Sequence, residues 1–161
     1  MTIGDQPGTT RSKRHIDASP DRVYRLLIDR EAVAEWKVPE GMTSVVHAFD
    51  PRAGGEFRFS LSYDASRSVG KSSPHTDTYH GRFLALVPNE QVVETMAFET
   101  DDPLMRGQMT VTYTLIPASG GTDLVAVHDG LPPGISADDN QTGWRMALDK
   151  LAALAEGGSR R

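Results

Sequence analysis

Apolar and polar residues alternate along the middle of the chain, and a period of two is typical of strands with one buried face. The alternation is clearest after Phe57 and after Met109, and turn residues such as Pro88 and Gly120 separate the stretches. The predicted strands comprise residues 43–49, 57–63, 79–87, 91–99, 109–115 and 122–128. A polar stretch at 64–77 is expected to form a loop. Residues 11–17 are expected to start the fold as a further strand.

Helical patterns flank these strands. Ser19 suits the N-cap of a helix, and Pro20 suits its first position. A second short helix is predicted over residues 31–36. The longest helix is predicted over residues 137–156, where apolar residues recur on one face. Its apolar stripe consists of Trp144, Leu148, Leu151 and Ala155.

The order of these elements predicts an α+β fold, because strands form one run between segregated helices. An amphipathic helix that follows such a run must bury its apolar face on the sheet, which is expected to contain about six antiparallel strands. The 161 residues suit one domain. We expect that domain over residues 11–157, a disordered lead-in at 1–10 and a frayed tail at 158–161.

The composition excludes several classes of protein. No run of about 18 apolar residues is present, so no membrane span is expected. The 17 basic and 22 acidic residues give a net charge of −5 without a basic block, which disfavours nucleic-acid binding. The chain contains no cysteine, which excludes disulfides and thiolate chemistry. A cytoplasmic location is compatible with this composition and is the one that we expect.

Seven short motifs, taken in order, resemble those of a known family. They are Ala18-Ser19-Pro20 with Val23, Trp36 with Pro39 and Gly41, Gly54-Gly55-Glu56-Phe57, Gly81 with Pro88, Gly120-Gly121-Thr122-Asp123-Leu124, His128-Asp129-Gly130, and Gly143-Trp144 with Leu148 and Leu151. The chain resembles the helix-grip fold of the START-like (SRPBCC) superfamily. Within it, the chain is similar to the AHSA1-like domain, named for homology to the activator of the Hsp90 ATPase. The resemblance covers about residues 11–156.

This resemblance implies a curved antiparallel sheet that grips the C-terminal helix, with a largely apolar cavity between them. It implies no single activity, since relatives include lipid carriers and aromatase- or cyclase-like enzymes. We expect a small hydrophobic or amphipathic ligand. The alternatives are a cyclase- or dehydratase-like enzyme acting on an aromatic or polyketide-like substrate, and a chaperone-linked interaction module. The co-chaperone that lends the name carries a second domain, for which 161 residues leave no room, so a chaperone partner is not expected.

A small-molecule site is typically an apolar pocket with a few polar groups. The predicted cavity wall consists of Trp36, Phe57, Phe59, Met96, Phe98, Met109, Tyr113, Trp144 and Leu148. Any one of these side chains could instead be packed core, and a shift of one residue in strand register would move the strand residues to the other face. We expect a ligand to enter near Trp36 and the loop at 100–106.

Three polar strand residues are weak candidates for acid–base chemistry: His80, Glu94 and His128. Each could equally be hydrogen-bonded or face solvent, so no catalytic residue is assigned. His75, Asp77 and His80 resemble metal ligands in type, but no second cluster completes a site, so no metal is expected. No phosphate-binding glycine motif is present, and no cofactor is expected. A homodimer through an exposed sheet edge is left open.

Overall fold

The computed structural model describes residues 8–39, 41–63 and 76–157. The elements are β1 Thr10–Ile16, α1 Pro20–Leu27, α2 Arg30–Trp36, β2 Met42–Phe49, β3 Glu56–Tyr63, β4 Thr76–Val87, β5 Gln91–Phe98, β6 Met109–Ala118, β7 Gly121–Asp129 and α3 Ala137–Gly157. This order confirms the predicted α+β fold. Most of the predicted lead-in, the tail and most of the 64–77 loop lie outside the described residues.

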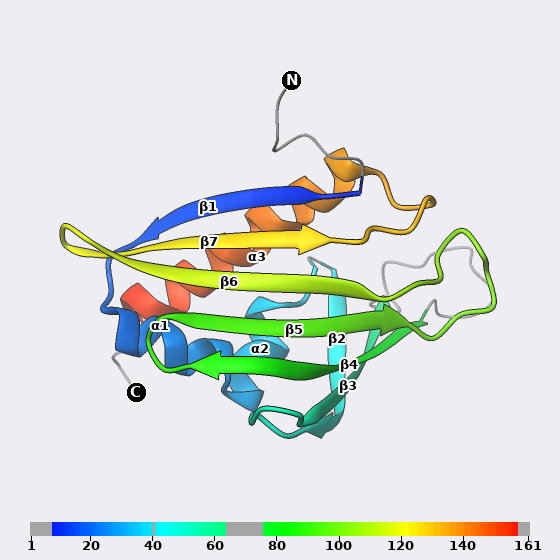
Figure 1. The fold of residues 1–161 in the computed structure, drawn as a ribbon, viewed down its shortest axis with the longest axis horizontal. Helices are drawn as coiled ribbons and strands as arrows, with labels where there is room; N and C mark the ends of the chain where they lie inside the picture. The colour runs from blue at the N-terminus through cyan, green and yellow to red at the C-terminus, as the bar shows by residue number, and fades with distance from the viewer. Residues whose placement is uncertain (1–7, 40, 64–75, 158–161) are drawn as a thin grey trace.

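The strands form one antiparallel sheet in the order β1-β7-β6-β5-β4-β3-β2. It has seven strands, one more than the approximate count predicted. β1 pairs with β7, which lies more than 100 residues later, so that Thr10 faces His128 and Ile16 faces Thr122. All three helices lie on the same face of the sheet, and α3 crosses behind the strands (Figure 1). In the strand order, β1 and β2 form the two edges of the sheet.

The strand register turns the predicted apolar residues toward the helices. Phe57 and Phe59 of β3 and Met109 and Tyr113 of β6 are all at most 2% exposed. On β4, Gly81 allows the backbone of β5 and the Phe57 ring to approach closely: a Cβ at this position would lie 1.8 Å from the Thr95 carbonyl oxygen. The helix-facing side of the sheet is consequently mostly apolar, with a few buried polar side chains on β5 and β7.

The Ser19 cap predicted for the first helix is observed, and the second helix has a cap that the sequence analysis did not identify. Ser19 Oγ accepts a hydrogen bond from Arg22 N at 3.2 Å, with Pro20 in the first turn of α1. The Asp29 carboxylate caps α2 by accepting from Ala32 N at 2.8 Å. The buried residues of α3 are Trp144, Leu148, Leu151, Ala152 and Ala155. The stripe predicted for this helix is confirmed.

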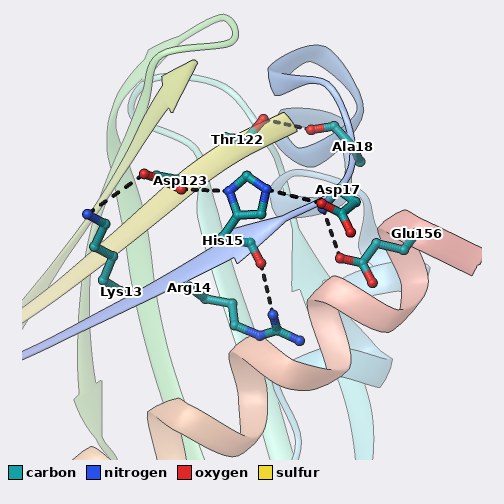
Figure 2. A network of polar contacts seen from close by, with 8 residues as sticks. All are labelled: Lys13, Arg14, His15, Asp17, Ala18, Thr122, Asp123 and Glu156. Atoms are coloured by element: carbon teal, nitrogen blue, oxygen red, sulfur yellow. Dashed lines mark hydrogen bonds and ion pairs between the residues drawn. The ribbon is translucent and has the colours of Figure 1, made fainter. Parts of the chain in front are cut away.

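A polar network joins the end of β1 to β7 and to the C-terminal part of α3 (Figure 2). His15 lies between two carboxylates, with Nδ1 at 2.8 Å from Asp123 and Nε2 at 3.1 Å from Asp17. The backbone N–H of Asp17 donates to the Glu156 carboxylate at 2.9 Å. Arg14 reaches α3 separately, by donating to Asp149 at 2.9 Å. The network therefore holds an edge strand against both its neighbour and the long helix.

Replacing His15 with glutamine should remove a pH-dependent part of the stability. The hydrogen bond from His15 to Asp123 raises the pKa of His15 above 6.5. Folding thus favours the protonated imidazole, so its contribution is fully present below pH 6.5 and is lost as the pH rises through the folded-state pKa. We expect the difference in urea midpoint between wild type and His15→Gln to shrink above about pH 6.5. Asp123→Asn should weaken the same dependence, because Asp17 still contacts the imidazole, and an unchanged dependence in either variant would contradict the assignment.

Candidate functional site

A cleft of about 320 Å³ lies between the N-terminal half of α3 and the helix-facing side of the sheet. Three groups of residues line it: strand residues, the segment after α2, and α3 with the loop before it. These residues are Leu61, Tyr79, Met96, Phe98, Met109 and His128; Lys37, Val38 and Pro39; and Ile135, Asp139, Asn140, Gly143, Trp144, Met146 and Ala147. Most of the lining is apolar, with polar groups at a few places.

The predicted wall residues divide between this cleft and the core beneath it. Four of them line the cleft: Met96, Phe98, Met109 and Trp144. Four others surround a narrow void of about 10 Å³: Trp36, Phe57, Phe59 and Tyr113. Leu148 is 1% exposed in the hydrophobic core. The structure thus brings only part of the predicted set together in the cleft.

The two tryptophans connect the core to the cleft through Tyr113. The Tyr113 ring makes edge contacts with both Trp36 and Trp144, at centroid distances of 6.1 and 5.7 Å. Trp36 also donates from Nε1 to the Leu26 carbonyl at 3.0 Å, which fixes its ring at the end of α2. Trp36 and Tyr113 therefore pack in the core directly beneath the cleft, beside Trp144. The residue after Trp36 lines the cleft itself.

That residue is Lys37, which the sequence analysis did not single out. Its ammonium pairs with the Glu94 carboxylate, and the two side chains are only 11% and 5% exposed. Lys37 Nζ also lies 5.3 Å from the centre of the Phe57 ring and 5.9 Å from that of Tyr79. Tyr113 donates from its hydroxyl to Glu94 at 3.4 Å. The only signal in the sequence was position, because Lys37 directly follows Trp36 at the C-cap of a helix.

His128, predicted as a weak catalytic candidate, is 5% exposed and lines the cleft. Its Nδ1 accepts from Trp144 Nε1 at 2.8 Å and lies 3.4 Å from the Asn140 amide nitrogen. Burial, assisted by the positive charge of Lys37, lowers the pKa of His128 to about 4. The imidazole is therefore neutral at pH 7. Glu94 is equally buried but belongs to the ion pair.

Replacing His128 with asparagine should make the protein more resistant to mild acid relative to wild type. The unfolded chain takes up a proton on this histidine below pH 6.5, whereas the folded protein does so only near pH 4. Wild-type stability should therefore fall between those values by about 3 kcal/mol from this group alone. The test is urea unfolding of both proteins at about pH 7 and pH 4. Equal losses of stability in the two proteins would show that His128 is not held neutral.

The third candidate, His80, lies on the opposite side of the sheet. Its side chain is 54% exposed, and Nδ1 lies 3.0 Å from Glu99. Arg58 donates two hydrogen bonds to the same carboxylate at 2.8 and 2.9 Å, and together these groups lower the pKa of Glu99 to about 2. His80 therefore belongs to a surface ion-pair cluster and does not share the cleft with His128.

Two further properties concern metal binding and membranes. Within residues 8–39, 41–63 and 76–157, no group of three or more His, Asp or Glu side chains is arranged to hold a metal ion. His75, one of the residues considered as a ligand, lies outside the described residues. None of the described helices combines the length and apolar character needed to cross a bilayer.

The fold and most of the sequence match known proteins. A family model described as activator of Hsp90 ATPase homolog 1-like protein matches residues 17–156. Among solved structures, a protein from Chromobacterium violaceum is 37% identical over 93% of this chain and 99% of that chain, with a TM-score of 0.82. No curated protein matches the chain significantly.

More distant structures show the same fold. A protein from Rhodobacter sphaeroides is 22% identical, covers 92% of this chain and 94% of its own, and has a TM-score of 0.75. The AHSA1 protein from Silicibacter pomeroyi is 20% identical, with coverages of 90% and 95% and a TM-score of 0.73. At these identities the likeness concerns the fold alone.

Proposed function

The chain belongs to the family of activator of Hsp90 ATPase homolog 1-like proteins, in the START-like superfamily, and from this premise we propose that it binds a small hydrophobic or amphipathic molecule in the cleft beneath α3. The observation that carries the proposal is the cleft itself. Its volume of about 320 Å³ lies within the range of small-molecule pockets, and apolar side chains dominate its lining.

The chemistry of the lining supports an adaptable apolar site. Met96, Met109 and Met146 contribute flexible thioether side chains, and Phe98 and Trp144 contribute aromatic surface. Unbranched methionine side chains can change rotamer to fit differently shaped ligands, whereas Trp144 is fixed by its hydrogen bond to His128. This combination suits a ligand with a rigid part beside Trp144 and a variable part toward Met146.

The proposal can be tested with N-phenyl-1-naphthylamine, a neutral fluorophore whose emission rises in apolar surroundings. We expect saturable one-to-one binding to the wild-type protein. Gly143 lines the cleft, and a Cβ there would have no heavy atom within 4 Å, so Gly143→Leu can fill the cleft without disturbing the core. This variant should bind at least about tenfold more weakly.

Thr142→Leu is the matched control, since it adds the same side chain at an exposed neighbour that does not line the cleft. It should bind as the wild type does. Absence of saturable binding, or equal binding by Gly143→Leu, would refute the proposal. If the wild type binds the fluorophore and Gly143→Leu does not, mass spectrometry of molecules that co-purify with the wild type alone would identify the natural ligand.

A cyclase- or dehydratase-like activity on an aromatic or polyketide-like substrate is the second candidate. It is favoured by the buried His128, which places a neutral hydrogen-bond donor in an apolar cleft. Incubation with a linear poly-β-ketone thioester, followed by mass spectrometry of the products, tests this activity. Cyclised or dehydrated product that disappears in His128→Asn would support it, and an unchanged substrate would exclude this chemistry for that compound class.

A further inference from the structure

The hydrogen bonds of His128 determine which nitrogen carries its proton. An indole N–H can only donate, so at 2.8 Å from Trp144 Nε1 the Nδ1 atom of His128 must accept. The neutral imidazole then carries its proton on Nε2. The tautomer is therefore fixed by a residue of α3, across the cleft from β7.

The Nε2–H of His128 has a weak partner. Among the described residues its one acceptor is Met109 Sδ, at 3.1 Å, and thioether sulfur is a poor acceptor. A buried donor without a good acceptor is unfavourable, because it has lost its hydrogen bond to water. His128 and Met109 both line the cleft, so an oxygen atom of a bound molecule can replace the sulfur.

The charges around the cleft favour a neutral oxygen over an anionic one. Lys37 lines the cleft, but the adjacent Glu94 carboxylate already compensates its charge. Asp139 of α3 adds a carboxylate to the lining. A ligand carboxylate would therefore lose its hydration without meeting an uncompensated cation, which is costly.

We propose that the cleft recognises apolar ligands that carry a neutral carbonyl oxygen, as in ketones, esters or lactones, and that His128 Nε2–H donates a hydrogen bond to this oxygen. This inference rests on the proposed ligand-binding function and adds the chemical class of the ligand. In the bound state, Met109 Sδ is displaced as the acceptor, and Trp144 keeps the imidazole in the required tautomer. His128 is thus a specificity-determining residue of the cleft.

The experiment compares two probes of nearly equal shape, 2-acetylnaphthalene and 2-isopropenylnaphthalene, which differ in a carbonyl oxygen against a CH₂ group. Each is titrated against protein-bound N-phenyl-1-naphthylamine, and the dissociation constant of 2-isopropenylnaphthalene divided by that of 2-acetylnaphthalene measures the preference for the carbonyl. His128→Asn places an amide oxygen near the position of Nδ1, which preserves the acceptor for Trp144 but removes the Nε2 donor. The preference should fall about fivefold to tenfold.

His128→Gln is the matched control, because its amide nitrogen can occupy the position of Nε2 and retain the donor. It should keep most of the carbonyl preference although it loses the acceptor for Trp144. Met109→Leu conserves volume and removes the competing sulfur, so it should raise the preference. An equal ratio in wild type and His128→Asn, or a lower ratio in Met109→Leu, would overturn the inference while leaving ligand binding intact. Failure of both naphthalenes and the fluorophore to bind would refute the binding function itself.

Discussion

Replacing Glu94 with leucine should lower the free energy of unfolding by about 3–5 kcal/mol, the largest effect that we expect from a single substitution. Glu94 is 5% exposed on its side chain and pairs with Lys37, which is 11% exposed. Leucine would leave the Lys37 ammonium buried without its counter-charge. It would also remove the acceptor of the Tyr113 hydroxyl. Both losses occur at the boundary between the core and the cleft.

The double variant Lys37→Met/Glu94→Leu separates the loss of a partner from the value of the pair. Replacement of a buried ion pair by apolar residues of similar volume is often neutral or stabilising, so the double variant should recover most of the lost stability. Urea unfolding at neutral pH measures all three proteins, together with Lys37→Met alone. A double variant as unstable as Glu94→Leu would show that the ion pair itself is required for folding.

Replacing Gly81 with alanine should lower the free energy of unfolding by about 3 kcal/mol. A Cβ at this position would lie 1.8 Å from the Thr95 carbonyl oxygen and 2.7 Å from the Phe57 ring. The first contact is with backbone of the neighbouring strand, which cannot move without loss of pairing between β4 and β5. The strands must therefore separate, or the Phe57 ring and the backbone must shift together.

Gly143→Ala is the control for this substitution, since it makes the same chemical change in open space within α3. Alanine has a higher helix propensity than glycine, so this variant should gain about 1 kcal/mol. Urea midpoints of Gly81→Ala and Gly143→Ala should consequently move in opposite directions from the wild type. A Gly81→Ala protein as stable as the wild type would show that the sheet accommodates the methyl group, and the close-approach argument would then be wrong.

Local patterns predicted the elements well because each pattern has a local cause. The alternation in β3 and β6 reflects one buried face, and the Ser19 cap and the Trp144 stripe reflect helix geometry. The pairing of β4 with β5 followed from a short turn at Asn89, whose φ is +66°. The pairing of β1 with β7 joins distant segments and had no comparable local signal. The strand at 11–17 was itself expected, but only the tertiary structure placed it beside β7, in a sheet of seven strands where about six were expected.

The candidate site was predictable only in part. Apolar character identifies side chains that avoid water, but it does not distinguish a packed core from the wall of a cleft. All four of the following residues were predicted as cavity wall, but Phe57 and Phe59 lie beneath the cleft, whereas Met109 and Trp144 line it. Lys37 was missed because a lysine after a helix is normally solvated, and its burial depends on Glu94, 57 residues later. The loop at 100–106, expected near the site of ligand access, is not among the described residues that line the cleft.

The sequence by itself determined the fold class, the Ser19 cap of α1 and the apolar stripe of α3, because these depend on periodicity and on neighbours within a few residues. Only the tertiary structure decided where empty space remains and which polar groups border it. Trp144 and His128 are 16 residues apart, and the loop between them and the packing of α3 on the sheet bring the indole N–H to the imidazole. Space and burial are properties of the whole packed chain, so they exist only once the helix and the sheet have come together.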